Sequence, residues 1–273
     1  MNGLVAPIAY QGGKQRIAAT ILDLISPSSN QHFYDLCCGS GAVSMELVNR
    51  GHDVHKITML DKSPWGMFWH MIGNGSFDLE KFKWHIQQLP KDLSLVKGHL
   101  KNLSRNPAAH DDAVYVFLLL QAGSFGGKAI WIADGKWKTH GFRSYWMPTA
   151  TSNRKHPVNP MMPLPDTLLE RVEIVSQRMR GVNGIHADIN QICPNSDGVT
   201  YIDPPYNGTT FYGYTFDVVA YAKNVRNKCY VSEGKPLSDV AHLISSGRKK
   251  GGISGERKVS PNEEWLSEFS GGT

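Results

Sequence analysis

The sequence predicts an α/β fold built around a mainly parallel β-sheet. One observation is the succession of "HFYDLCC", a short apolar strand, the turn "GSG", the helix pattern "AVSMELVNRG" and a second strand, "KITMLDK". Strand, glycine turn, helix and strand in this order are typical of a parallel sheet. The alternation returns late in the chain, in "PDTLLERVEIVSQRMRGV" and "GVTYID". A hydrophobic fraction of 41% and a charged fraction of 19% are those of a folded globular protein.

Periodicity supports each of these elements in turn. Ile17, Ile21 and Ile25 recur every four residues, which predicts an amphipathic helix that ends before Pro27. The helix after the glycine turn is closed by Gly51. "KCYVSE" predicts a further strand. The late helix has one apolar face, formed by Leu168, Val172, Val175 and Met179.

The region between the two α/β parts predicts an inserted lobe. It holds most of the tryptophans, and "AIWIADGKWKTHGF" predicts a hairpin that turns at Asp134-Gly135. A proline-rich loop follows. We therefore expect a sheet domain at 1–62 and 163–246, a lobe at 63–162 and a basic, glycine-rich tail at 247–273. Within the tail, "SPNEEWLSEF" predicts one short helical turn.

Composition and charge exclude several classes of protein. The longest apolar run, Ala113 to Leu120, is too short to cross a bilayer, and no secretory signal precedes the first helix. Four cysteines without C-x-x-C spacing predict reduced thiols, so we expect a soluble, cytoplasmic protein. The histidines lack metal-ligand spacing, so we expect no metal. A net charge of +5 permits an anionic partner without requiring one.

The glycine turn and the acid after the second strand together predict a cofactor site. Gly39 and Gly41 allow the backbone to approach a ligand at a helix N-terminus, although a tight turn that merely packs well has the same pattern. Asp61 ends the next strand, where a carboxylate can accept hydrogen bonds from ribose hydroxyls or cap the following helix. Ser44 replaces the third glycine of a dinucleotide motif. A cofactor without a pyrophosphate, such as S-adenosylmethionine (SAM), fits best.

A second motif, Asp203-Pro204-Pro205-Tyr206, ends the strand "GVTYI". Neither proline can donate to a sheet, and both stiffen the chain. A carboxylate, a proline carbonyl and a tyrosine ring are thereby held in a fixed relation. Such a corner suits a flat ring that bears an amino group.

Taken in order, these motifs resemble the Dam-type DNA adenine-N6 methyltransferases. "PIAYQGGK" is similar to their N-terminal cofactor segment, "DLCCGSGAV" to the glycine motif, "FLLLQAGSFGGK" to the start of the recognition lobe and "IDPPY" to the catalytic motif. The resemblance implies a Rossmann-like SAM-dependent methyltransferase sheet with helices on both faces, plus an inserted target-recognition lobe of helices and a β-hairpin. It also implies a stand-alone enzyme of the phage or bacterial type.

The resemblance implies cofactor contacts at positions spread over the sheet domain. The residues concerned are Tyr10, Lys14, Asp35, Gly39, Gly41, Asp61 and Asp188. Asp35 would lie near the amino acid end of SAM, Asp61 at the ribose and Asp188 at the adenine amino group. The alternatives are an ordered loop cap for Tyr10 and Lys14, and an N-cap of a short helix for Asp188.

For catalysis, Asp203 and the carbonyl of Pro204 would accept the two N–H groups of the target amine, while Pro205 stiffens the corner. This arrangement would free the nitrogen lone pair for direct in-line methyl transfer. Tyr206 would stack on the flipped base, because a base must leave the duplex for this chemistry. We expect one of the later aromatics, such as Phe211 or Tyr214, to close the pocket.

In the lobe, basic side chains interleaved with aromatics predict contacts to DNA, at Lys128, Lys136, Lys138 and Arg143. The alternative is a solvated hairpin with a tryptophan core. Ala9 replaces a basic residue of GATC-recognising relatives, so we expect a different or relaxed specificity. The last strands of the family sheet are expected to be reduced or absent. Two other functions stay open: RNA adenine-N6 methylation, and a catalytically inert DNA-binding protein.

Overall fold

The computed structural model describes residues 3–108, 111–145, 150–151, 162–205, 216–251 and 258–271. Its main sheet has seven strands in the order β5-β2-β1-β6-β7-β9-β8. The first five are parallel, and β9 runs antiparallel to both of its neighbours. Their bounds are β1 Phe33–Leu36, β2 Ile57–Asp61, β5 Asn183–His186, β6 Val199–Ile202, β7 Lys228–Glu233, β8 Ala241–Gly251 and β9 Lys258–Phe269. The predicted α/β class with a mainly parallel sheet is confirmed.

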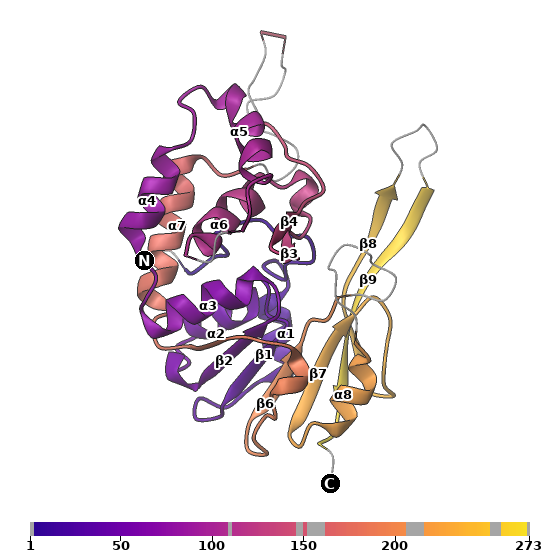
Figure 1. Ribbon diagram of the computed structural model, residues 1–273. Helices are drawn as coiled ribbons and strands as arrows, with labels where there is room; N and C mark the ends of the chain where they lie inside the picture. Colours follow the sequence, from indigo (N-terminus) through magenta and orange to yellow (C-terminus); the bar gives the residue numbers. More distant parts are fainter. Residues whose placement is uncertain are drawn as a thin grey trace.

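Helices cover both faces of this sheet (Figure 1). On one face, Phe33 and Ile57 pack with residues such as Ile21 of α1 and Trp69 of α3. On the other, Leu36 packs with Val218 of α8. The helices at the sheet are α1 Ala18–Ile25, α2 Ala42–Asn49, α3 Pro64–Asn74 and α8 Val218–Asn224, whereas α7 Pro165–Arg178 lies beside α4 (Leu79–Gln87) (Figure 1). The strands and helices predicted from periodicity in these parts of the chain are confirmed, including the buried faces of α1 and α7.

The lobe consists of α4 (Leu79–Gln87), α5 (Val96–Leu103), α6 (Ala113–Gly123) and a hairpin of β3 (Trp131–Ala133) and β4 (Lys136–Lys138). Every residue of α6 is buried, so this helix forms the centre of the lobe. Its side chains join the same hydrophobic core as the sheet. The hairpin turns at Asp134 and Gly135, whose φ angles of 53° and 66° are those of a type I′ turn. The predicted hairpin and its turn are confirmed.

α3 lies within the range predicted for the lobe but packs on the sheet. A Cβ on Gly184 of β5 would lie 2.2 Å from the backbone of Trp69, and one on Gly66 would lie 2.0 Å from the carbonyl oxygen of Asp61. Two glycines therefore let α3 sit directly against the sheet. Among the described residues, the lobe therefore begins after α3 and not at residue 63, where we predicted its start.

The C-terminal part of the chain required a correction. We expected the last strands to be reduced or absent and "SPNEEWLSEF" to form a helical turn. Instead, 258–269 is β9, which pairs with β7 and β8, and 247–251 completes β8. Leu266 and Ser267 are fully buried in this pairing. A pairing between distant strands buries these residues, and the local sequence pattern carries little sign of it.

Candidate active site

A cavity of about 440 Å³ opens at the carboxyl ends of β1 and β6. The sheet order reverses between these two strands, because the chain continues outward from β1 to β2 on one side and from β6 to β7 on the other. Crevices at such switch points are where open α/β sheets bind ligands. The cavity is lined by parts of 10–14, 35–43, 60–63, 129–131, 188–189 and 201–205, together with Phe216.

The glycine turn after β1 has two glycines with different physical roles. Both have positive φ angles, 50° at Gly39 and 73° at Gly41. A Cβ on Gly41 would lie 2.3 Å from the ring of Trp69, so this glycine is required by packing beneath the turn. A Cβ on Gly39 would lie 3.1 Å from the ring of Tyr10, on the cavity side. Gly39, unlike Gly41, lines the cavity, so its backbone is open to that space.

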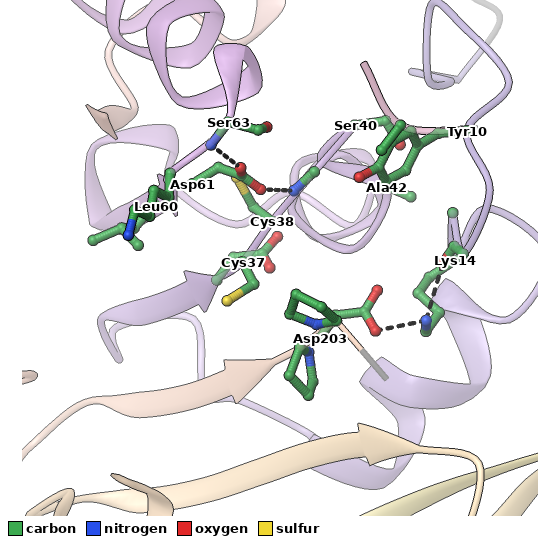
Figure 2. A pocket seen from close by; sticks show the side chains of 18 of the residues that line it. Tyr10, Lys14, Cys37, Cys38, Ser40, Ala42, Leu60, Asp61, Ser63 and Asp203 are labelled. Atoms are coloured by element: carbon green, nitrogen blue, oxygen red, sulfur yellow. Dashed lines mark hydrogen bonds and ion pairs between the residues drawn. The ribbon is translucent and has the colours of Figure 1, made fainter. Parts of the chain in front are cut away.

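Asp61 ties the glycine turn to the start of α3. One carboxylate oxygen accepts a hydrogen bond from the backbone N–H of Gly39, and the other accepts from the N–H of Ser63, both at 2.8 Å (Figure 2). The helix cap itself is Ser63, whose hydroxyl accepts from the N–H of Trp65. Each carboxylate oxygen has a second lone pair. Asp61 therefore fixes the turn and retains acceptor capacity toward the cavity.

Asp35 lies at the base of the cavity and is almost fully buried. The hydroxyl of Ser44, which replaces the third glycine of a dinucleotide motif, donates to it at 2.6 Å. Burial raises the pKa of Asp35 to about 7, although the bond from Ser44 opposes the shift. A cationic ligand group placed beside this carboxyl would favour its ionised form.

Lys14 and Asp203 form a buried ion pair that joins the N-terminal segment to the end of β6. The Lys14 ammonium donates to one Asp203 oxygen at 2.7 Å and to the carbonyl of Gly12 at 2.9 Å (Figure 2). Glu264 of β9 lies 3.4 Å from the same ammonium. The side chains of Lys14 and Asp203 are 5% and 21% exposed. One cation is thus shared between two carboxylates.

The charges around this pair set its protonation. Burial raises the pKa of Asp203 to about 6; Lys14 opposes the shift, whereas Glu264 and Glu233 reinforce it. Burial alone would lower the pKa of Lys14, but Asp203 and Glu264 outweigh it and the pKa is raised. We therefore take Lys14 as a permanent cation and Asp203 as a carboxylate above about pH 6.

Asp188 follows β5 and lines the cavity. One of its oxygens accepts from the backbone N–H of Asn190, so it caps a short 3₁₀ helix, as the structural alternative predicted. Its other oxygen pairs with Lys62 at 2.8 Å. The bond from Lys62 and those from Asn190 lower the pKa of Asp188, so it is ionised at neutral pH. A cap and a ligand contact are compatible at this position.

The rest of the DPPY motif is only partly described. Pro204 and Pro205 line the cavity with Asp203, and the backbone N–H of Asp203 donates to the carbonyl of Leu36 at 3.2 Å. Tyr206, Phe211 and Tyr214 lie outside the described residues, so their predicted roles stay predictions.

The predicted DNA-contacting residues of the lobe are placed on and beside the hairpin. The cross-strand pairs put Trp131, Lys136 and Lys138 on one face and the buried Trp137 on the other. Lys136 is exposed, and Lys138 is half-buried. Arg143 donates to the carbonyl of Ala122 at 2.8 Å and is half-buried, so part of its guanidinium serves the lobe itself.

Lys128 belongs to a loop that is organised by Gln121. This buried side chain donates to the carbonyls of Gly127 and Lys128 and accepts from the N–H of Ile130. The N–H of Gln11 in turn donates to Gly127. These bonds bring the lobe segment at 129–131 over the cavity, beside the N-terminal segment.

The sequence reasoning missed Glu264, Gln121 and Trp131 as parts of the site. Glu264 lay in a segment interpreted as a tail, so nothing pointed to it. A polar residue inside the apolar run before "AGSFGGK" was the available indication for Gln121. For Trp131, the available indication was its position next to the basic residues of the hairpin.

The part of the chain that the structure describes has no candidate metal site and no candidate membrane-spanning helix. No group of three or more His, Cys, Asp or Glu side chains in that part is arranged to hold a metal ion. No described helix is long and apolar enough to cross a membrane. Cys37, Cys38, Cys193 and Cys229 form no disulfide in this structure.

Comparison with protein families covers part of the N-terminal segment and the glycine motif. Residues 10–61 match the family model of the D12 class N6 adenine-specific DNA methyltransferases. The match confirms the resemblance to the Dam type and indicates a DNA adenine methyltransferase. The matched segment includes Tyr10, Lys14, both glycines and Asp61, and it ends before Asp203. A comparison with curated proteins found no match.

Proposed function

We propose that the chain transfers the methyl group of SAM to the exocyclic N6 of adenine in DNA, with the adenine flipped out of the duplex into the cavity. The observation that carries this proposal is the position of Asp203. It lies at the switch point of the sheet, followed by two prolines, with one carboxylate oxygen held by Lys14. The family match, although it covers a different segment, supports the same chemistry.

The cavity suits SAM in size and in chemistry. A volume of about 440 Å³ is within the range of small-molecule sites. The backbone approach at Gly39 and the acceptor capacity of Asp61 suit the ribose, and Asp188 suits an adenine amino group. Asp35, whose pKa is raised to about 7, suits the ammonium group of the amino acid end. When bound, SAM would supply a methyl group activated by a positively charged sulfur.

The amine would be oriented by two acceptors. One oxygen of Asp203 is taken by Lys14, so the other would accept one amine N–H, and the carbonyl of Pro204 would accept the second. This geometry withdraws the nitrogen lone pair from the ring and directs it at the methyl group. One amine proton must leave as the new bond forms. A carboxylate with a pKa of about 6 is suited to take it.

Lys14 has a role in this scheme that differs from the cofactor contact predicted for it. Its ammonium is held by Asp203, Glu264 and the carbonyl of Gly12, which leaves the Asp203 side chain one orientation. We therefore propose Lys14 as a positioning residue for Asp203. Tyr10, which lies against Gly39, keeps its predicted role at the cofactor.

Transfer of tritium from methyl-labelled SAM tests the function. We expect label in duplex DNA, recovered as N6-methyladenine, and a loss of at least about 10²-fold in rate for Asp203→Ala, because one transition-state acceptor is removed. SAM binding, measured by calorimetry, should be largely retained. Asp203→Asn checks that loss of activity is not loss of folding, and Asp166→Asn, on the exposed surface of α7, is the matched control.

Each other outcome of this experiment has a definite meaning. Label in RNA alone would replace DNA by RNA as the substrate. DNA binding without any transfer would identify an inert binding protein. Unchanged transfer by Asp203→Ala would rule out the proposed mechanism.

A further inference from the structure

A second hollow lies in the lobe, apart from the cavity. It has a volume of about 470 Å³ and lies between α5 and the segment that follows the hairpin. In Figure 1, α5 occupies the end of the lobe away from the sheet. We call this hollow the lobe groove. It is lined by Lys97, Lys101, Ser104, Arg105, Phe125 and residues 139–142.

The groove is basic, and its charges are not neutralised within the described residues. Lys97, Lys101 and Arg105 are exposed, and none of them has a carboxylate within ion-pair distance in that part of the chain. No acidic residue lines the groove among the residues that the structure describes. By contrast, Lys81 on α4 is paired with Asp112. A concave surface on which the described residues include three cations without an ion-pair partner and no acid is suited to an anion.

Two of the three cations lie on α5 and the third follows its end, an arrangement that suits a polymer of phosphates. Lys97 and Lys101 are one helical turn apart, and the adjacent Val96 and Leu100 are buried in the core. At 1.5 Å per residue the two lysines are about 6 Å apart along the helix axis, and Arg105 lies two residues beyond Leu103, where α5 ends. One DNA strand carries a phosphate about every 3.4 Å along its axis. The two lysines therefore span about two phosphate steps of one strand, and Arg105 lies beyond them.

The opposite wall of the groove is held rigidly. The N–H of Phe125 donates to Gly141, and that of Arg143 donates to Gly123, at 3.0 and 2.9 Å. A Cβ on Gly123 would lie 2.2 Å from the side chain of Leu100, so α5 approaches the end of α6 closely. Phe125 remains 58% exposed at the edge, available for contact with a sugar or a base.

The groove adjoins the cavity through the hairpin. Trp131 lines the cavity and His140 lines the groove, and their ring centroids are 5.5 Å apart. We propose that the lobe groove binds the sugar-phosphate backbone of duplex DNA beside the adenine that enters the cavity. This proposal rests on the proposed function, because it takes DNA as the partner.

The test compares two triple variants of the full chain. In the first, Lys97, Lys101 and Arg105 are changed to alanine. The control changes Lys56, Lys223 and Arg226 to alanine, which removes the same charge at the amino ends of the strands, away from the cavity. All six positions are half-buried or exposed, so both proteins are expected to fold. Circular dichroism and SAM calorimetry verify this.

Binding to a fluorescein-labelled duplex is measured by anisotropy between 50 and 200 mM salt. We expect the groove variant to bind at least tenfold more weakly than the control at the lower salt. The slope of log K against log salt should fall by about 2 to 3, at about 0.9 per lost phosphate contact. Equal affinity and slope in the two variants would overturn the proposal.

The readouts separate this proposal from the proposed function. If the unmodified chain methylates DNA and the two variants bind alike, the function stands and the groove assignment fails. If the unmodified chain binds DNA but transfers no methyl group, the function fails and the slope still tests the groove. Loss of binding to RNA but not to duplex DNA in the groove variant would also overturn the proposal.

Discussion

The cavity and the lobe groove use positive charge in opposite ways. In the cavity, Lys14 is 5% exposed, lies between two carboxylates and serves the orientation of one side chain. In the groove, Lys97, Lys101 and Arg105 are exposed and unpaired among the described residues. A buried charge without a partner is strongly destabilising, whereas an exposed charge contributes little to stability. The buried charge of Lys14 therefore fixes the geometry of the candidate active site. The exposed charges of the groove are available to bind an anionic partner with an affinity that depends on salt.

The largest expected effect is that of Lys14→Met. Removing one partner of a buried pair costs about 3–5 kcal/mol. The pKa of Asp203, already raised to about 6, should rise further because Lys14 opposes the shift. A carboxyl group whose pKa is higher in the folded state than in the unfolded state destabilises the protein increasingly as pH rises through the folded-state pKa. The decrease in the free energy of unfolding caused by Lys14→Met should therefore be larger at pH 8 than at pH 6, as measured by urea unfolding.

Lys101→Met is the matched change in the groove. It should alter the free energy of unfolding by less than about 0.5 kcal/mol at either pH, because the side chain is exposed. Equal losses for Lys14→Met and Lys101→Met would remove the distinction between the two regions.

The next effect concerns the glycine turn. Gly41→Ala should destabilise the protein by about 3 kcal/mol, because the new Cβ would overlap the Trp69 ring at a φ of 73°. Gly39→Ala meets only the ring of Tyr10, at 3.1 Å. We expect it to cost less stability but to weaken SAM binding more. Thermal unfolding and SAM calorimetry of the pair check this, and the reverse order would contradict the two roles.

The smallest effect is that of Glu264→Gln. Glu264 raises the pKa of Asp203, so its neutralisation should lower that pKa from about 6. Activity requires the Asp203 carboxylate in the proposed mechanism, so the acid side of the pH–rate profile should move to lower pH. Glu263→Gln is the control, since this exposed neighbour bonds the indole of Trp265 instead. A profile that moves equally in both variants would show that Glu264 has no specific influence.

The predicted elements that proved correct share a physical feature. α1 and α7 bury one stripe of a 3.6-residue period, and β1, β2 and β6 are short, apolar and followed by a turn or a proline. β9 has neither property. Its sequence holds Pro261 and three acids, and it is a strand because β7 and β8 supply its partners.

For the site, the residues that follow a parallel strand were predictable. Asp61 and Asp203 end strands of one sheet, so the fold class alone places them at the same edge. The pairing of Lys14 with Asp203 was not predictable, because the two residues are 189 positions apart and lie on different elements. The same holds for Glu264.

The amino acid sequence alone determined the α/β class, the glycine turn, the acid-proline corner and the hairpin turn, because each depends on residues that are neighbours in the chain. Only the tertiary structure decided that Lys14 forms an ion pair with Asp203, that β8 and β9 complete the sheet, and that the cations of α5 line a groove beside the cavity. These features depend on which distant surfaces pack together. Such packing follows from the burial of the whole core and leaves little trace in any short stretch.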